Sequence, residues 1–236
     1  MVLKVLLTGG SGILGKQIIF DARESHHVQI YHPTRTELDI ASIASAKSYL
    51  NKHDFDMILH CAAYTKTLQT REETQECIET NIVGTWNLLR HAMSKEMRFV
   101  YISTDYVFDG KSGNYLPGAA INPVGNYARS KAAAELMVRM YDKALCIRTS
   151  FVPNEFPHPA AFVDQYTCRD YVDIISPKVL QAALSSKVGV AHVGTVKKSV
   201  FEMAKKRKED VKEISINDVS FYLPPDISLA CLENEI

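Results

Sequence analysis

The sequence predicts an α/β protein with a doubly wound parallel sheet, and three observations favour this class. Short apolar runs of strand length alternate with longer segments of helical periodicity over the first 150 residues. A glycine-rich turn joins the first apolar run to the first helix. A Ser-Thr-Asp-Tyr segment follows the fourth run, at the strand end where ligands bind in sheets of this class. We therefore expect a Rossmann-type sheet with helices on both faces.

The first strand, turn and helix have the layout of a phosphate-binding device. The apolar run at residues 2–7, broken only by Lys4, is too short for a helix and suits a buried strand. Gly9 permits a tight turn, Gly12 lets a pyrophosphate approach the backbone, and Gly15 lets the helix pack close to the strand. Free N–H groups and the positive end of the helix dipole then face the anion. The pattern indicates dinucleotide binding rather than a merely tight turn.

The remaining elements alternate in chain order. Helices are expected at about 13–23, 43–51, 72–94 and 127–141, and strands at about 26–31, 57–60, 98–103 and 144–148. Five apolar residues of the helix at 72–94 form a stripe that we expect to face the core: Ile78, Ile82, Trp86, Leu89 and Met93.

The chain is expected to divide near residue 150. Residues 1–150 form the dinucleotide-binding Rossmann domain, and residues 151–236 form mainly a small substrate-binding lobe. Within that lobe, one strand and one helix at about 189–206 are expected to return to the Rossmann sheet, and another helix is expected near 177–186. A proline-rich loop spans 153–159, and we expect the chain from 154 to 172 to be mostly irregular.

Composition and charge argue against several classes of function. Lysine plus arginine and aspartate plus glutamate both number 27, so no global field attracts nucleic acid or an anionic membrane. The five cysteines are widely spaced and form no CxxC, which is typical of reduced thiols in a cytoplasmic protein. No apolar run reaches the roughly 18 residues of a membrane-spanning helix. No histidine has a carboxylate or cysteine at metal-ligand spacing, so we expect no catalytic metal.

Candidate proton chemistry lies after the fourth strand. Tyr127 and Lys131 are four residues apart and share one face of a helix. A free tyrosine has a pKa of about 10, and a neighbouring ammonium would lower that pKa. Thr104, at the end of the fourth strand, could hold the substrate oxygen that the phenol protonates. This spacing also arises by chance on exposed helices. The interpretation of Tyr127 and Lys131 as catalytic therefore depends on the upstream glycine turn and on Thr104.

Five segments, TGGSGILG, HCAAYT, STDYVFDG, YARSK and RTSFV, occur in this order and resemble the extended short-chain dehydrogenase/reductases. Within that group the chain most resembles the dTDP-4-dehydrorhamnose reductase family, and the resemblance covers nearly the whole chain. It implies NADPH-dependent reduction of the 4-keto group of a nucleotide-linked 4-keto-6-deoxyhexose, with NADH as an alternative cofactor. A homodimer is compatible with it.

Two alternatives stay open. One is a related enzyme with another carbonyl substrate, including a 3,5-epimerase/4-reductase acting on a UDP-sugar. The other is a non-catalytic NADP-binding subunit similar to the regulatory subunit of methionine adenosyltransferase. Because Thr104, Tyr127 and Lys131 are all present, the sequence favours an enzyme over a binding subunit.

The resemblance also implies a role for each site residue. The catalytic triad falls on Thr104, Tyr127 and Lys131. Cofactor contacts fall on Gly9, Gly12, Ile13, Leu14, Gly15, Asp39, Ile40, Ala62, Ala63, Tyr64, Tyr127 and Lys131. Substrate contacts fall on Thr65, Thr104, Asp105 and Phe151, and Asn81 supports the site indirectly.

Three positions refine this expectation. The second strand ends without an acidic residue for a ribose diol, and Arg35, with Thr34, would accommodate a 2′-phosphate, so we expect a preference for NADPH. Tyr106 stands where related dehydratases carry a second carboxylate, which argues against elimination of water. Phe151 stands where relatives often carry a tryptophan against the sugar, so the aromatic face is kept without the indole N–H.

Overall fold

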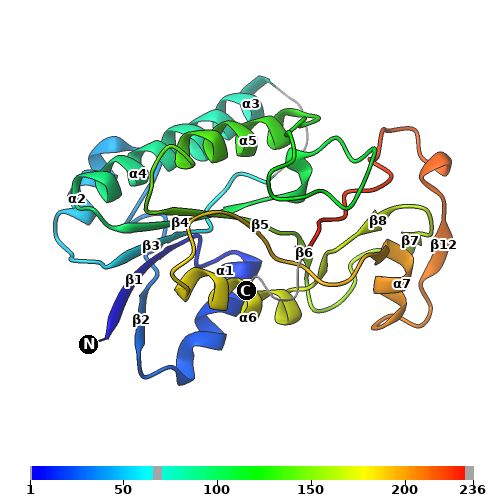
Figure 1. Cartoon of the computed structure of the whole chain (residues 1–236), viewed down its shortest axis with the longest axis horizontal. Coiled ribbons are helices and arrows are strands. Elements are labelled where there is room, and N and C mark those ends of the chain that lie inside the picture. The colour runs from blue at the N-terminus through cyan, green and yellow to red at the C-terminus, as the bar shows by residue number, and fades with distance from the viewer. Residues whose placement is uncertain (1, 66–70, 232–236) are drawn as a thin grey trace.

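A six-stranded parallel sheet forms the centre of the computed structural model, which describes residues 2–65 and 71–231 (Figure 1). Its strands are β1 (Leu3–Thr8), β2 (Val28–Tyr31), β3 (Met57–His60), β4 (Arg98–Ser103), β5 (Ala144–Arg148) and β10 (Gly189–His192). They lie in the order β10-β5-β4-β3-β1-β2, and every neighbouring pair is parallel. The chain order reverses between β1 and β3, which makes the carboxyl ends of these strands the expected place for a ligand.

Helices cover both faces of this sheet (Figure 1). One face carries α2 (Ile43–Leu50), α3 (Arg71–Ile78), a π-helix (Glu79–Gly84), α4 (Thr85–Ser94) and α5 (Asn126–Val138). The other face carries α1 (Ile13–Asp21) and α6 (Val172–Leu184). Alternate residues of β1 enter opposite halves of the core, since Leu6 packs with the α2 and α4 side while Val5 and Leu7 pack with Ile18 of α1. The predicted doubly wound α/β class is confirmed.

The lobe is built from short strands beyond β5, on the right in Figure 1. β6 (Phe151–Val152) pairs with β9 (Asp170–Tyr171), β7 (Ala160–Phe162) with β12 (Lys212–Ile214), and β8 (Tyr166–Thr167) with β11 (Lys198–Ser199). Short 3₁₀ turns span Ala22–Glu24, Asp105–Val107 and Ile216–Asp218. The segment 154–172 is thus mostly irregular, as expected, with β7, β8 and β9 as short strands within it.

Of the elements expected to return to the Rossmann sheet, the strand and the helix behave differently. The strand, β10, lies in the sheet beside β5. The helix, α7 (Val200–Lys205), packs in the lobe, because Val200 and Met203 are buried against Ala161 and Val211 rather than against the sheet. The division of the chain at residue 150 stays a prediction.

The expectation that the apolar stripe at 72–94 faces the core is wrong. Ile78, Trp86 and Met93 are 46%, 43% and 44% exposed, whereas Leu89 is buried. The buried face includes the positions that precede the stripe by one residue. Two of them, Asn81 and Thr85, are polar and hydrogen-bonded inside the protein. Hydrophobic periodicity cannot recognise such a face, because it takes polar residues to face water.

The helix expected near 177–186 begins earlier, at Val172, and contains Pro177 in its interior. Val172, Ile175 and Val179 are all buried in the cluster that also contains Ile18 of α1. The sequence pattern suggested Pro177 as the start of the helix. Packing of the apolar face against α1 instead extends the helix to residues before the proline.

Candidate active site

The glycine turn has the geometry that its sequence predicts. Gly9 has φ +76°, and a Cβ there would lie 2.6 Å from the Ala62 nitrogen. A Cβ on Gly15 would lie 2.3 Å from the Gly9 carbonyl oxygen, so the start of α1 can touch the turn only without a side chain. At Gly12, by contrast, a Cβ would approach only the Gly9 oxygen, at 3.3 Å. No side chain caps α1 at Gly12, which leaves the N–H groups at its start available to an anion.

The turn after β3 is fixed from the π-helix. The Asn81 side chain accepts a hydrogen bond from the Tyr64 nitrogen at 2.7 Å and donates to the Tyr64 oxygen at 3.0 Å. Its amide also donates to the Ser130 hydroxyl at 2.9 Å, and that hydroxyl donates to the Tyr127 carbonyl at 2.8 Å. Asn81 therefore ties the turn at Ala62–Tyr64 to the helix that carries Tyr127, which is the indirect support expected of it.

The segment expected to flank the adenine is held by the same long helix. A Cβ on Gly84 would lie 2.9 Å from the Ile40 side chain, and the Asn87 amide donates to the Ile40 carbonyl at 2.9 Å. Arg35 is 80% exposed, and its Nε lies 4.0 Å from a carboxylate oxygen of Asp39. The two cofactor residues predicted at this edge of the sheet, Arg35 and Asp39, thus lie together.

The three predicted catalytic residues come from two neighbouring elements. Thr104 follows β4, and Tyr127 and Lys131 lie on α5. The Thr104 hydroxyl lies near enough to the Tyr127 phenol to act against the rise of its pKa. Lys131 lies deeper, where its ammonium donates to the Ile102 carbonyl at 2.7 Å and sits 4.0 Å from the centre of the Tyr101 ring. The structure therefore brings the two hydroxyl groups together, with the lysine one helical turn below them.

Burial controls the proton equilibria of the triad. It lowers the pKa of Lys131 to about 7. The contacts of the ammonium with the Ile102 carbonyl and the Tyr101 ring favour the charged form and so oppose this lowering. Burial, followed by the negative charge of Asp105, raises the pKa of Tyr127 above its ordinary value. The expected lowering of the Tyr127 pKa by Lys131 is therefore not found.

Asp105 is buried beside the triad with both carboxylate oxygens engaged. One oxygen accepts from the Thr104 hydroxyl at 3.1 Å, and the other accepts from Ser150. Burial raises the pKa of Asp105, and the positive charge of Arg169 acts against that rise. The Arg169 guanidinium also donates to the Tyr106 hydroxyl at 3.4 Å. Arg169 was missed from the sequence, because no local spacing connects it to Tyr106, 63 positions away in the chain.

Two predicted substrate residues lie outside this hydrogen-bonded group. Thr65 is exposed at the end of the described turn after β3. Phe151 begins β6 and is half-buried against the core on the α1 and α6 side. In the described parts of the chain, neither makes a hydrogen bond to the triad, so their predicted roles rest on the resemblance.

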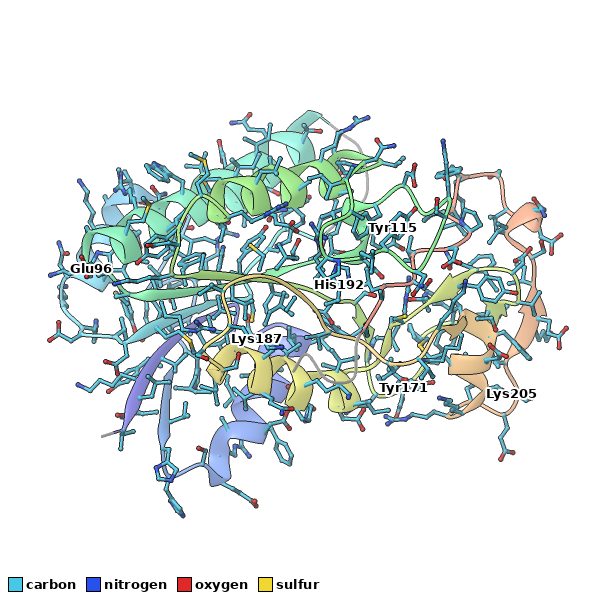
Figure 2. All side chains as sticks on the ribbon, viewed as in Figure 1. Glu96, Tyr115, Tyr171, Lys187, His192 and Lys205 are labelled. Carbon is cyan, nitrogen blue, oxygen red and sulfur yellow. The ribbon has the colours of Figure 1, made fainter. Side chains whose placement is uncertain are left out.

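A fully buried ion pair lies directly below the triad and was also missed. Glu135 follows Lys131 by four residues on α5, and its carboxylate accepts from Arg148 of β5 at 2.6 and 3.2 Å. Ser103 donates to the same carboxylate at 2.6 Å. Arg148 also donates to the Pro117 carbonyl at 3.0 Å and lies 3.3 Å from the ring nitrogen of His192, which Figure 2 labels at the carboxyl end of the sheet. This pair joins α5, β4 and β5 at the level of the site.

The part of the chain that the structure describes, residues 2–65 and 71–231, contains no group of three or more histidine, cysteine, aspartate or glutamate side chains that could hold a metal ion. None of its helices combines the length and apolar character needed to cross a membrane.

Comparison with known proteins gives consistent matches. A family model described as the RmlD substrate binding domain matches residues 3–167. The dTDP-4-dehydrorhamnose reductase of Aggregatibacter actinomycetemcomitans is 30% identical over 155 residues, covering 65% of this chain and 53% of that protein. Methionine adenosyltransferase 2 subunit beta of Xenopus tropicalis is 28% identical over 141 residues, covering 57% of this chain and 42% of that protein. The chain thus spans about half the length of these curated relatives.

Structural similarity extends further along the chain. The crystal structure of dTDP-4-dehydrorhamnose reductase from Bacillus anthracis in complex with NADP matches with a TM-score of 0.86 at 27% identity. That match covers 97% of this chain and 90% of the other. Similarity in fold therefore continues through the lobe beyond residue 167, where the family model ends.

Proposed function

The chain belongs to the family of the RmlD substrate binding domain, and from that membership we propose that it reduces a nucleotide-linked 4-keto-6-deoxyhexose with NADPH. The observation that carries the proposal is the placement of Thr104 beside Tyr127 at the carboxyl end of the sheet, with Lys131 buried on the same helix face. Relatives named as reductases of dTDP-4-keto sugars support the substrate class.

The residues at the first turn fit a dinucleotide. Only glycine is accommodated at Gly9 and Gly15, and Gly12 offers an open approach to the free N–H groups of α1. We assign the pyrophosphate to this turn and a 2′-phosphate to Arg35. Bound NADPH would supply the hydride for the reduction. The crystal structure of a similar reductase in complex with NADP supports this choice of cofactor.

The protein's own contribution is to stabilise charge and supply a proton. Thr104 and Tyr127 would donate hydrogen bonds to the substrate carbonyl oxygen, on which negative charge grows during reduction. The raised pKa of Tyr127 keeps its phenol protonated, so it is present as an acid. After proton transfer, the ammonium of Lys131 would stabilise the phenolate.

Substrate recognition is assigned to the surroundings of this oxygen. Asp105, fixed by Thr104 and Ser150, would position the sugar, and Phe151 would supply an aromatic face. The guanidinium of Arg169 offers a positive charge for an anionic part of the substrate, such as a phosphate group. Tyr106 cannot replace the second carboxylate that a dehydratase requires.

Single-turnover oxidation of NADPH tests this assignment, after a panel of dTDP-, UDP- and GDP-linked 4-keto sugars has identified an accepted substrate. Tyr127→Phe should bind NADPH but reduce about 10²–10⁴-fold more slowly. Thr104→Val should lose about 2–4 kcal/mol of transition-state stabilisation, and Asp105→Asn should mainly weaken sugar binding. Tyr222→Phe, at an exposed phenol, is the matched control. Reduction by Tyr127→Phe at the rate of the control would show that another group supplies the proton.

A second candidate function is a non-catalytic NADP-binding subunit, favoured by the similarity to methionine adenosyltransferase 2 subunit beta. Such a subunit would keep its function in a complex when Lys131 is replaced. Steady NADPH turnover by the isolated chain with any keto sugar would eliminate this candidate.

We also propose a cytoplasmic homodimer. The apolar residues exposed on the outer side of α3, α4 and α5 offer a surface for a second copy, and the free cysteines suit a reducing compartment. Such exposed residues lie on the neighbouring helices α4 and α5 and just after the end of α5, which permits a symmetric contact: Trp86 and Met93 on α4, Leu136 on α5, and Met140 beyond its end.

A further inference from the structure

A buried histidine lies at the point where the chain order of the sheet reverses. His60 is the last residue of β3, is 1% exposed, and lies directly opposite Thr8, the last residue of β1. Its Nδ1 lies 2.7 Å from the Thr8 hydroxyl, and its Nε2 lies 2.9 Å from the Thr85 hydroxyl at the start of α4. The ring therefore connects the carboxyl end of β1 to the helix that covers this face of the sheet.

The partners of this ring fix which of its nitrogens carries a proton. Thr85 donates its one hydroxyl proton to the Asn81 carbonyl at 2.6 Å, so its oxygen can only accept from His60. Burial, followed by the positive charge of Lys131, lowers the pKa of His60 to about 3, so the ring is neutral and holds a single proton. That proton lies on Nε2, and Nδ1 accepts a hydrogen bond from Thr8.

The direction of these hydrogen bonds continues into the turn after β3. Because the Thr8 hydroxyl gives its proton to His60, its oxygen has a lone pair free to accept from the Ala62 nitrogen, at 3.4 Å. Thr8 is followed directly by Gly9, and a Cβ on Gly9 would lie 2.6 Å from that same nitrogen. The two turns that are expected to hold the cofactor thus meet beside the Thr8 hydroxyl.

Packing alone does not account for this arrangement. The His60 ring lies 6.0 Å from the ring of Phe99 and 5.7 Å from that of Tyr101, so it fills space in the core as any aromatic ring would. An apolar ring could fill the same space, but it could not orient a hydroxyl group. The hydrogen bonds that begin at the Asn81 carbonyl instead form one directed chain, which ends at the backbone nitrogen of Ala62.

We propose that His60 is a positioning residue for the dinucleotide. By fixing the direction of the Thr8 hydroxyl, it holds the turn at Ala62 against the start of the glycine turn, so that both turns are in place before the cofactor binds. The inference rests on the proposed function for the identity of the ligand. The positioning itself is a property of the cofactor-free chain and can be measured there.

Titration of the full chain with NADPH, followed by fluorescence, tests the proposal with two pairs of variants. An asparagine amide comes close to the place of Nδ1 and a glutamine amide to that of Nε2, so His60→Gln should lose the contact with Thr8 and His60→Asn should keep it. We expect His60→Gln and Thr8→Val to weaken NADPH binding by about 3- to 10-fold, the worth of one hydrogen bond. His60→Asn and Thr8→Ser should bind NADPH nearly as the wild type does.

Tyr141→Phe is the matched control for the loss of a hydroxyl. The Tyr141 hydroxyl is buried and donates to the Met97 carbonyl at 2.8 Å, just before β4 begins and therefore at the amino edge of the sheet. Its removal should lower stability and leave NADPH affinity unchanged. Thr8→Val leaves the His60 ring in place, so it keeps the test valid if the His60 variants do not fold.

Two measurements on the cofactor-free chain complete the test. Amide hydrogen exchange at Ala62 should be faster in His60→Gln and Thr8→Val than in Tyr141→Phe. The nitrogen chemical shifts of the wild-type His60 ring should place its proton on Nε2, since the two neutral tautomers differ in these shifts.

The proposal fails if the His60 proton lies on Nδ1, because the hydrogen bonds would then run in the reverse direction. It also fails if Tyr141→Phe weakens NADPH binding as much as Thr8→Val does, because affinity would then follow stability. Unchanged exchange at Ala62 in His60→Gln and Thr8→Val would show that other contacts hold the turn. A wild type that does not bind NADPH would instead contradict the proposed reductase function, and exchange at Ala62 would still decide the role of His60.

Discussion

Replacing Glu135 by glutamine should destabilise the fold far more than replacing any surface carboxylate. The carboxylate and the Arg148 guanidinium are both 0% exposed and are joined at 2.6 Å. Glu135→Gln keeps the shape of the side chain but leaves the charge of Arg148 buried and uncompensated. Ser103, which donates to the same carboxylate at 2.6 Å, would lose a charged acceptor as well.

The magnitude follows from burial. Removing one partner of a buried ion pair costs about 3–5 kcal/mol, mainly because the remaining charge is left without compensation. For a chain of this size each kcal/mol lowers the melting temperature by about 2–4 °C, so Glu135→Gln should lower it by roughly 6–20 °C. Glu96→Gln breaks the exposed pair with Lys143 and should cost no more than about 1 kcal/mol.

Thermal and urea unfolding followed by circular dichroism measure both variants, and Arg148→Met completes a double-mutant cycle. The variant carrying both Glu135→Gln and Arg148→Met should lose less than the two single losses combined, because no charge is left buried alone. A melting temperature for Glu135→Gln within about 3 °C of Glu96→Gln would refute the reasoning, since the pair would then contribute no more than a surface contact.

Four further outcomes are expected. Gly9→Ala should abolish tight NADPH binding in fluorescence titration, because a left-handed φ and the Ala62 nitrogen at 2.6 Å leave no room for a methyl group. Arg35→Ala should reduce the preference for NADPH over NADH by about 10- to 100-fold in the same titration. Between pH 7 and 9 Lys131 has lost its proton in the folded chain but keeps it in the unfolded chain, because burial lowers its pKa to about 7. The free energy of unfolding of the wild type, measured with urea, should therefore rise with pH by at most about 1.4 kcal/mol per pH unit. Lys131→Met should remove this rise. Trp86→Lys should convert the proposed dimer to a monomer in light scattering, and an unchanged mass would place the contact elsewhere.

Elements governed by local sequence were predicted closely. The strand at 57–60 has the predicted bounds, because a short apolar run buried on both faces has a clear pattern. The turn at Gly9 was also predictable, since a left-handed φ next to a close backbone contact requires glycine. The same holds for Tyr127 and Lys131, whose spacing of four places them on one helix face.

Features that depend on contacts distant in the chain could not be predicted. The buried face of the helix at 72–94 carries Asn81 and Thr85, and their burial is explained only by partners such as Tyr64 and His60. Arg169 of the lobe contacts Tyr106, and no sequence spacing predicts this contact. The pKa of Lys131 depends on how completely the fold encloses it, whereas the sequence shows only its distance from Tyr127.

One face of α5 connects stability to the proposed chemistry. Tyr127, Lys131 and Glu135 follow one another at intervals of four residues, from the half-buried phenol to the fully buried carboxylate. The packing that encloses Lys131 and lowers its pKa is continuous with the packing that holds Glu135 against Arg148. The negative charge of Glu135 acts to raise the pKa of Lys131 against this burial, so Glu135→Gln should lower the Lys131 pKa further. A slower reaction in Glu135→Gln with a shifted pH profile would thus show that Glu135 acts through Lys131, and a slower reaction with an unchanged profile would show that it acts only on the amount of folded protein.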